Sequence, residues 1–246
     1  MDVATNFVDI HTHILPGVDD GAKSLEVSLD MARLFVEHGT TSLFATSHGF
    51  APSLHVDAED ILRETFRLND ALIDAQIPLT VRPAMEIRYH SDIVRKVLQG
   101  LALGLGGAEK PNYILIELPT RDWPEDVWEA IYEFAIRDIT VVIAHPERNL
   151  AAQRDEELLD RAIEEGAILQ LTAGSIMGQF GPICENLSKR WLMSHKIHCI
   201  ASDAHDPVVR APGIDLALKK VTEQWQMPEQ AAQCVRTAQR IWDSYK

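Results

Sequence analysis

Histidines and carboxylates cluster at the end of an apolar run near the start of the chain. Residues 9–21 read DIHTHILPGVDDG, in which His11 and His13 are one residue apart and Asp19 and Asp20 follow. In an H-x-H pair on a strand, both imidazoles project to the same side because side chains alternate with a period of two. Nitrogen and carboxylate ligands together suit zinc, manganese or iron better than calcium. The motif therefore indicates a metal site rather than an ordinary polar loop.

The elements that must position these side chains are short strands alternating with amphipathic helices. Strand-like runs are expected at 7–13, 41–48, 79–87, 113–119, 140–147, 168–173 and 198–205. Helices are expected at 24–38, 57–75, 124–138 with Pro124 in the first turn, and 228–246, whereas 100–112 is expected to be a loop. Nearly continuous apolar strands separated by helices imply parallel βα units that are buried on both faces. Seven such units favour an α/β fold with a closed or nearly closed (β/α) barrel over an open sheet.

Candidate ligands stand at the ends of these expected strands. In a parallel barrel the C-terminal strand ends converge on one face, where active sites are built, so residues nearly two hundred positions apart would share one pocket. A single histidine at a strand end is usually a polar rim residue, but five of the ten histidines fall there together with suitable carboxylates. The set is His11, His13, His48, Glu86, Glu117, His145, Asp203 and His205. Asp203 and His205 are two positions apart, so on a strand they too are expected to project to the same side.

The remaining histidines do not join this pattern. We interpret His38 as a cation at a helix C-terminus. The other four, which we interpret as surface or loop residues, are His55, His90, His195 and His198.

Length and composition are those of a soluble globular protein. A chain of 246 residues with 46% hydrophobic and 24% charged residues can bury one barrel-sized core. We find no apolar run of membrane-spanning length and no signal-peptide pattern. Cys184, Cys199 and Cys234 are widely spaced, which indicates neither a disulfide framework nor a zinc ribbon and fits a reducing cytoplasm. A net charge of -14 argues against nucleic acid as a partner.

An ordered set of short motifs carries a resemblance to a known family. HTHILPGVDDG, TSHG, AMEI, IELP, AHPER and SDAHDPVVR, which together extend roughly from Phe7 to Arg210, resemble the PHP (polymerase and histidinol phosphatase) metallo-phosphoesterases. Within that superfamily they look most like the manganese-dependent protein-tyrosine phosphatases of bacterial capsule and exopolysaccharide loci. The resemblance implies a distorted (β/α)7 TIM-like barrel, a single domain over residues 1–246, and three divalent metal ions. Manganese is expected, with iron and zinc as alternatives.

The resemblance also implies which side chains hold each ion. The first ion would be held by His11, His13, Glu86 and Asp203. The second would take Asp20, His48 and His205. The third would take Glu117 and His145 and share Glu86 as a bridge.

Residues around the ligands follow the family pattern with one departure. Asp20 matches the ligand position, so Asp19 is expected to cap the loop or to support a ligand. Arg148 and Arg210 match the two arginines of the family's phosphate clamp. Ala84 stands where the family often has glycine, and its methyl group is a potential obstacle to close backbone packing.

The activity implied is hydrolysis of phosphotyrosine by a metal-activated hydroxide, in which the ions and arginines neutralise the phosphoryl oxygens. The residues assigned to catalysis are Arg148, Arg210, Asp20 and His205. The implied partner is a phosphotyrosine-bearing protein, expected to be a polysaccharide-assembly tyrosine kinase, in a cytoplasmic and not a membrane-embedded setting. Trp123 is a candidate for stacking on the substrate ring, with packing inside the protein as an equal alternative.

Three rival interpretations remain. Cys184 and Arg190 have the C-x₅-R spacing of cysteine-dependent phosphatases, but the intervening ENLSK lacks glycine and indicates a helix. A second rival keeps the metals and changes the substrate to histidinol phosphate or another small phosphomonoester. A third is a non-catalytic, metal-stabilised binding module for a polysaccharide-assembly kinase, which would not need a complete hydrolytic centre.

Overall fold

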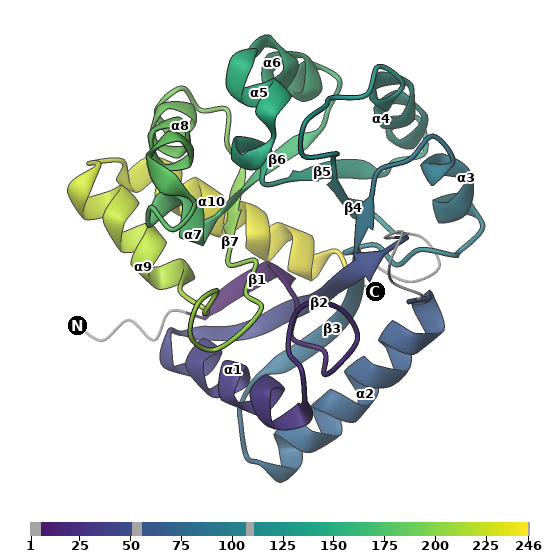
Figure 1. Ribbon diagram of the computed structural model, residues 1–246, viewed down its shortest axis with the longest axis vertical. Coiled ribbons are helices and arrows are strands. Elements are labelled where there is room, and N and C mark those ends of the chain that lie inside the picture. The colour runs from purple at the N-terminus through teal and green to yellow at the C-terminus, as the bar shows by residue number, and fades with distance from the viewer. Residues whose placement is uncertain (1–5, 51–55, 107–110, 246) are drawn as a thin grey trace.

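The protein is a barrel of seven parallel strands surrounded by helices (Figure 1). The computed structural model describes residues 6–50, 56–106 and 111–245. The strands are hydrogen-bonded in chain order, which confirms the predicted α/β barrel. They are β1 (Phe7–Thr12), β2 (Thr40–Gly49), β3 (Thr80–Arg88), β4 (Tyr113–Glu117), β5 (Thr140–Ala144), β6 (Ile168–Thr172) and β7 (Cys199–Ala201).

The helices lie mostly outside the barrel (Figure 1). They are α1 (Leu25–Glu37), α2 (Ala58–Asp74), α3 (Ile93–Leu98), α4 (Val127–Ala135), α5 (Leu150–Arg154), α6 (Glu157–Glu164), α7 (Ala173–Ile176), α8 (Gly181–Met193), α9 (Ile214–Lys219) and α10 (Pro228–Asp243). A 3₁₀ turn, η1 (Pro146–Arg148), and a π-helical turn, η2 (Lys220–Gln224), complete the set. Among the described residues, no helix combines the length and apolar character needed to span a bilayer.

Local signals account for most of the helix boundaries. Ser24 caps α1 through Val27 N–H, and Gly39 follows its end with a φ of 76°, a conformation that favours glycine. The helix predicted from residue 124 begins only at Val127. Pro124 lies in a preceding turn, where its carbonyl accepts a hydrogen bond from Val127 N–H (3.2 Å). Residues 100–106 and 111–112 form no helix or strand, as predicted, and 107–110 lie outside the described residues.

Two apolar cores lie on the two faces of the barrel wall. In β5, Val141 and Ile143 pack outward against the helices, whereas Val142 and Ala144 pack into the barrel interior. The interior core also contains residues of α10, which packs against β1 and β7. Ala84 belongs to this interior core and is fully buried, so its methyl group is accommodated by packing.

Backbone contacts between β1 and the segment after β7 close the barrel. Thr12 and Ala204 form a parallel bridge, and His13 N–H donates to the Ala204 carbonyl (2.9 Å). The buried Asp9 carboxylate accepts hydrogen bonds from Ser202 N–H, at 3.1 and 3.2 Å. The first and last strands therefore meet, and the candidate ligands that follow them are brought together.

Candidate metal centre

Strand alternation directs most candidate ligands into the barrel. Interior-facing Ala84 precedes Glu86 by two residues, and Leu115 and Ala201 precede Glu117 and Asp203 by the same interval. Because side chains on a strand alternate, Glu86 and Glu117 point to the same side as these apolar residues. The apolar interior therefore gives way to ligand-type side chains at the C-terminal ends of the strands.

Strand β1 departs from this regular register. Val8 and Ile10 face the interior core, and the pairing with β2 then shifts between Asp9 and Thr12. Such an irregularity re-aims the side chains that follow it. Strict alternation from Val8 and Ile10 would point His11 and His13 away from the interior, and the shift allows both histidines to face the site.

The segment after β7 also departs from expectation. The strand ends at Ala201, so Asp203 and His205 lie beyond it. Asp203 has a φ of 53°, in the left-handed region. The strand alternation that we expected to relate Asp203 to His205 is therefore absent. His145 is also left-handed, with a φ of 33°. Non-glycine residues held in this region are strained and concentrate at functional sites.

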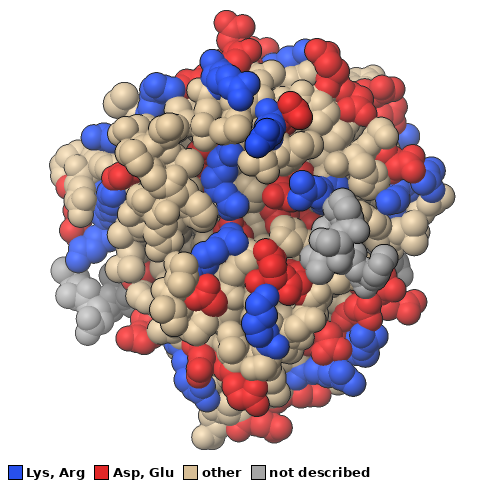
Figure 2. Space-filling view, viewed as in Figure 1, with Lys and Arg blue, Asp and Glu red and all other residues tan. Residues whose placement is uncertain are grey.

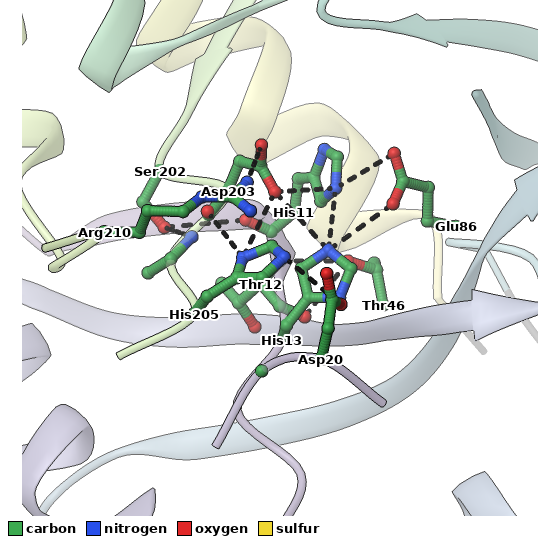
Figure 3. A network of polar contacts seen from close by, with 12 residues as sticks. His11, Thr12, His13, Asp20, Thr46, Glu86, Ser202, Asp203, His205 and Arg210 are labelled. Carbon is green, nitrogen blue, oxygen red and sulfur yellow. Dashed lines mark hydrogen bonds and ion pairs between the residues drawn. The ribbon is translucent and has the colours of Figure 1, made fainter. Parts of the chain in front are cut away.

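Four buried side chains form the tightest cluster (Figure 3). The Nε2 atoms of His11 and His13 are 3.2 Å apart. Each lies 3.4 Å from a Glu86 oxygen and 3.4 Å from Asp203 Oδ1. The structure therefore brings together all four residues of the first expected ligand set.

These separations fit side chains that share a cation. Two ligand atoms bound to one ion at about 2.1 Å lie roughly 3.0–3.4 Å apart for angles between octahedral and tetrahedral. His48 Nδ1 lies 3.0 Å from Glu86 Oε2, yet it is buried and has no hydrogen-bond partner among the described residues. The His48 imidazole and the Glu86 carboxylate are thus close without a hydrogen bond between them, and a divalent ion would satisfy both.

Both oxygens of Glu86 face histidines. Oε1 lies 2.9 Å from His145 Nε2 and 3.4 Å from His11 Nε2. Oε2 faces His48 and His13. This carboxylate therefore stands between separate groups of nitrogen donors, which is the placement that a bridging ligand requires.

The second expected set also converges, nearer the surface. Asp20 Oδ1 lies 3.4 Å from His48 Nε2 and 3.5 Å from His205 Nε2. The Asp20 side chain is 60% exposed, in contrast to the fully buried His11. His13 joins this group as well, so the two sets are contiguous.

The third expected set is only partly assembled. His145 contacts Glu86 and groups with His11 and Asp203, whereas Glu117 groups with His48 and Glu86. The expectation that Glu117 and His145 hold one ion stays a prediction.

Outer contacts orient two of the imidazoles. His13 Nδ1–H donates to Asp19 Oδ2 (2.8 Å), and His11 Nδ1 lies 2.9 Å from Gln170 Oε1. An oxygen partner on Nδ1 holds the proton there and leaves Nε2 free as a metal ligand. Asp19 therefore has the supporting position expected of it. Our sequence analysis missed Gln170, although a polar residue inside the apolar run ILQLT was a usable signal.

The two expected clamp arginines converge on Asp203. Arg148 Nη1 and Arg210 Nη2 donate to Asp203 Oδ2 at 2.6 and 2.5 Å, while Oδ1 faces the histidines. One oxygen of this carboxylate thus belongs to the ligand cluster, and the other belongs to the arginine pair. Figure 2 shows that Lys and Arg side chains lie around the central hollow of this face, with acidic side chains beside and within it.

Opposing effects shift the pKa values of these groups. Burial lowers the pKa of His48, but the Asp20 and Glu86 carboxylates outweigh it and raise that pKa to about 10. Burial raises the pKa of Glu86 and of Asp203, yet the surrounding histidines dominate and hold both well below the usual value. The carboxylates therefore stay ionised, and a divalent ion would compete with protons for the imidazoles.

Cys184 does not form a phosphate-binding loop. Both Cys184 and Arg190 lie within α8, as expected, and Cys184 is buried. Burial raises the pKa of its thiol, which disfavours a nucleophilic thiolate. All three cysteines are free thiols, in agreement with the absence of a disulfide framework.

Two other expectations concern residues near the site. Trp123 stacks on Trp128, with ring centroids 5.9 Å apart, which favours the packing role over a substrate contact. His198 lies outside any helix or strand, as expected of a loop residue, and its Nδ1 accepts a hydrogen bond from Leu169 N–H (3.1 Å). His38 lies at the C-terminal end of α1, with its Nδ1 3.0 Å from Asp215 Oδ1, and its charge there stays a prediction; His55 lies outside the described residues.

Comparison with known proteins gives a consistent result. Residues 7–241 match the family model described as capsular polysaccharide synthesis, CpsB/CapC. Tyrosine-protein phosphatase YwqE of Bacillus subtilis is 36% identical over 82% of this chain and 79% of its own length. Tyrosine-protein phosphatase CpsB of Streptococcus agalactiae is 28% identical over 86% of this chain and 88% of its own length.

A solved structure extends this similarity to the fold. It comes from crystal structures of YwqE from Bacillus subtilis and CpsB from Streptococcus pneumoniae, described as unique metal-dependent tyrosine phosphatases. The two chains superpose with a TM-score of 0.91 at 31% identity, over 97% of this chain and 95% of the other.

Proposed function

The chain belongs to the capsular polysaccharide synthesis CpsB/CapC family, and we propose that it is a metal-dependent protein-tyrosine phosphatase. The observation that carries this proposal is the divided carboxylate of Asp203. Its Oδ1 faces the histidine cluster and its Oδ2 accepts from both arginines. A phosphoryl group beside Asp203 would meet cation ligands on one side and guanidinium donors on the other.

The arginines supply directed positive charge. A guanidinium group is planar and can bond two phosphate oxygens at once, which a lysine cannot do. Arg210 Nε is buried and has no hydrogen-bond partner among the described residues, so it is a donor available to a phosphoryl oxygen. Arg148 and Arg210 would bind and orient the phosphoryl group and oppose the charge that develops on its oxygens.

Three divalent ions, with manganese as the expected metal, are part of the proposal. The first would be held by His11, His13, Glu86 and Asp203, the second by Asp20, His48 and His205, and the third by Glu117, His145 and the shared Glu86. When bound, the ions would supply Lewis acidity that activates water for attack on phosphorus. The phenolate leaving group has a conjugate acid with a pKa near 10, so it needs less protonation than a serine alkoxide would. We assign no residue as general acid.

The proposed substrate is a phosphotyrosine-bearing protein of capsule or exopolysaccharide assembly, with its tyrosine kinase as the expected partner. The names of the related phosphatases and of the matched family support this choice. We further propose that residues 1–246 work as one domain in the cytoplasm.

Hydrolysis rates for four substrates test the function: a phosphotyrosine peptide, the matched phosphoserine peptide, histidinol phosphate and p-nitrophenyl phosphate. The kcat/KM for the phosphotyrosine peptide should exceed the kcat/KM for the phosphoserine peptide and for histidinol phosphate. Chelation should abolish turnover, and added manganese should restore it. A preference for histidinol phosphate would identify a small-molecule phosphatase instead. Binding of the kinase without hydrolysis of any of the four substrates would favour a non-catalytic module.

A further inference from the structure

Phe180 lies against both clamp arginines, and we propose that it is a positioning residue for phosphate binding. The Arg148 Cζ atom is 4.6 Å from the centroid of the Phe180 ring, and the Arg210 Cζ atom is 5.9 Å away. Both distances fall within about 6 Å, the range in which a cation is attracted to an aromatic face. This inference rests on the proposed function, because it concerns the same arginine pair.

The arginine pair needs such support because its charges repel. Both guanidinium groups donate to one oxygen, Asp203 Oδ2, so two positive charges share a single hydrogen-bonding partner there. An aromatic ring that attracts both of them offsets part of this repulsion without using their N–H donors. Phe180 would therefore hold the pair close together while leaving donors free for phosphoryl oxygens.

The chain around Phe180 is shaped to admit the ring. A Cβ atom added to Gly174 would lie 3.0 Å from the ring atom Cε2 of Phe180 and 2.5 Å from Gln179 Oε1. A larger residue at position 174 would push the Gln179 side chain aside and press the Phe180 ring by a few tenths of an ångström, so Gly174 gives the ring its present room. Gly181, directly after Phe180, has a φ of 86°, which favours glycine at this first residue of α8.

A buried contact joins the same segment to the Arg148 turn. Glu147 is fully buried, and its Oε1 accepts from Ser175 Oγ (2.6 Å) and from Thr172 N–H (3.2 Å). Glu147 directly precedes Arg148 in η1. Residues 172–180 are thus connected to Arg148 twice, through the Glu147 carboxylate and through the Phe180 ring.

The decisive comparison is Phe180→Leu, which keeps apolar bulk and removes the aromatic face, against Phe180→Tyr, which keeps the face. Phe180→Leu should lower kcat/KM for the phosphotyrosine peptide about tenfold and weaken inhibition by inorganic phosphate by a similar factor, which is about 1.4 kcal/mol. Phe180→Tyr should stay within about twofold of wild type. Metal content and Tm should be the same in both variants.

Two further variants separate positioning from general packing. Phe66→Leu is the matched control, since Phe66 is 68% exposed on α2 and the same change there should be silent. In a protein that carries both Arg148→Ala and Arg210→Ala, adding Phe180→Leu should have no further effect.

Phosphate binding distinguishes failure of this inference from failure of the proposed function. If the manganese-loaded wild type hydrolysed no phosphotyrosine, its affinity for inorganic phosphate, measured by titration calorimetry, would still test Phe180. The inference is overturned if Phe180→Leu binds phosphate like wild type. It is also overturned if Phe180→Tyr is as defective as Phe180→Leu, or if Phe180→Leu has its full effect without the arginines.

Discussion

Replacing Glu86 by Gln should disturb more than one metal position, because both of its oxygens face nitrogen donors. Oε1 lies 2.9 Å from His145 Nε2, and Oε2 lies 3.0 Å from His48 Nδ1. The amide keeps one oxygen of nearly the same shape but removes the negative charge, and its NH₂ group cannot bind a cation. The change is therefore electrostatic rather than steric.

The expected effect on metal affinity is large. A unit negative charge about 2 Å from a dication contributes about 4 kcal/mol even at the dielectric constant of water, and more in a buried site. Glu86 is 1% exposed, so solvent screens its charge poorly. About 4 kcal/mol corresponds to roughly a 10³-fold loss of affinity for each ion that depends on this carboxylate.

Metal analysis of the purified variant is the appropriate assay. After equal loading and desalting, Glu86→Gln should retain at least two metal equivalents fewer than wild type and should have almost no turnover, while circular dichroism shows a folded barrel. Glu147→Gln is the matched control for metal content, because Glu147 is also fully buried but bonds to Ser175 and Thr172 instead of the histidines. A full metal complement in Glu86→Gln, or the loss of one ion only, would refute the bridging role and with it the three-ion assignment.

Four further predictions follow from the site. Arg148→Ala and Arg210→Ala should each lower kcat/KM by ~10²–10³-fold at unchanged metal content, because each removes an oriented donor to the phosphoryl group; near-normal steady-state kinetics would contradict the clamp. Cys184→Ser should leave steady-state kinetics almost unchanged, whereas a thiol-dependent reaction would be abolished. Asp19→Asn should weaken metal affinity by ~10–100-fold in a metal titration, because the imidazole it orients loses a charged acceptor; an unchanged affinity would remove its supporting role. The pKa of His48 rises from 6.5 in the unfolded chain to about 10 in the metal-free fold, so its contribution to stability is present in full below pH 6.5 and is lost as pH rises through about 10. Urea unfolding of the chelated protein should therefore show a lower free energy of unfolding at high pH. His48→Gln should reduce this pH dependence.

Patterns between near neighbours were sufficient to predict much of the fold. Apolar strands alternating with capped amphipathic helices indicated a parallel barrel, and all seven strands lie within two residues of their predicted starts. The candidate ligands could be grouped in advance because parallel strands bring their C-terminal ends to one face. His11, His13, Glu86 and Asp203 are close together for this reason.

Expectations failed where the backbone departs from regular geometry. The last strand ends at Ala201, and the left-handed turn at Asp203 replaces the alternation expected for Asp203 and His205. In β1, Ile10 faces the interior, so alternation would turn the next residue, His11, outward; a register shift lets His11 face the site instead. Neither irregularity has a glycine or proline at the residues concerned, so the sequence carried no local signal for it.

The amino-acid sequence by itself determined the strand and helix pattern, the types of side chain available as ligands, and the order in which they reach the C-terminal face. Only the tertiary structure decided that Gln170 supports His11, that Asp203 divides its oxygens between histidines and arginines, and that Phe180 lies against both guanidinium groups. The physical reason is distance along the chain. Periodicity and capping act within a few residues, whereas these contacts join segments that meet only when the barrel closes and its loops pack over the strand ends.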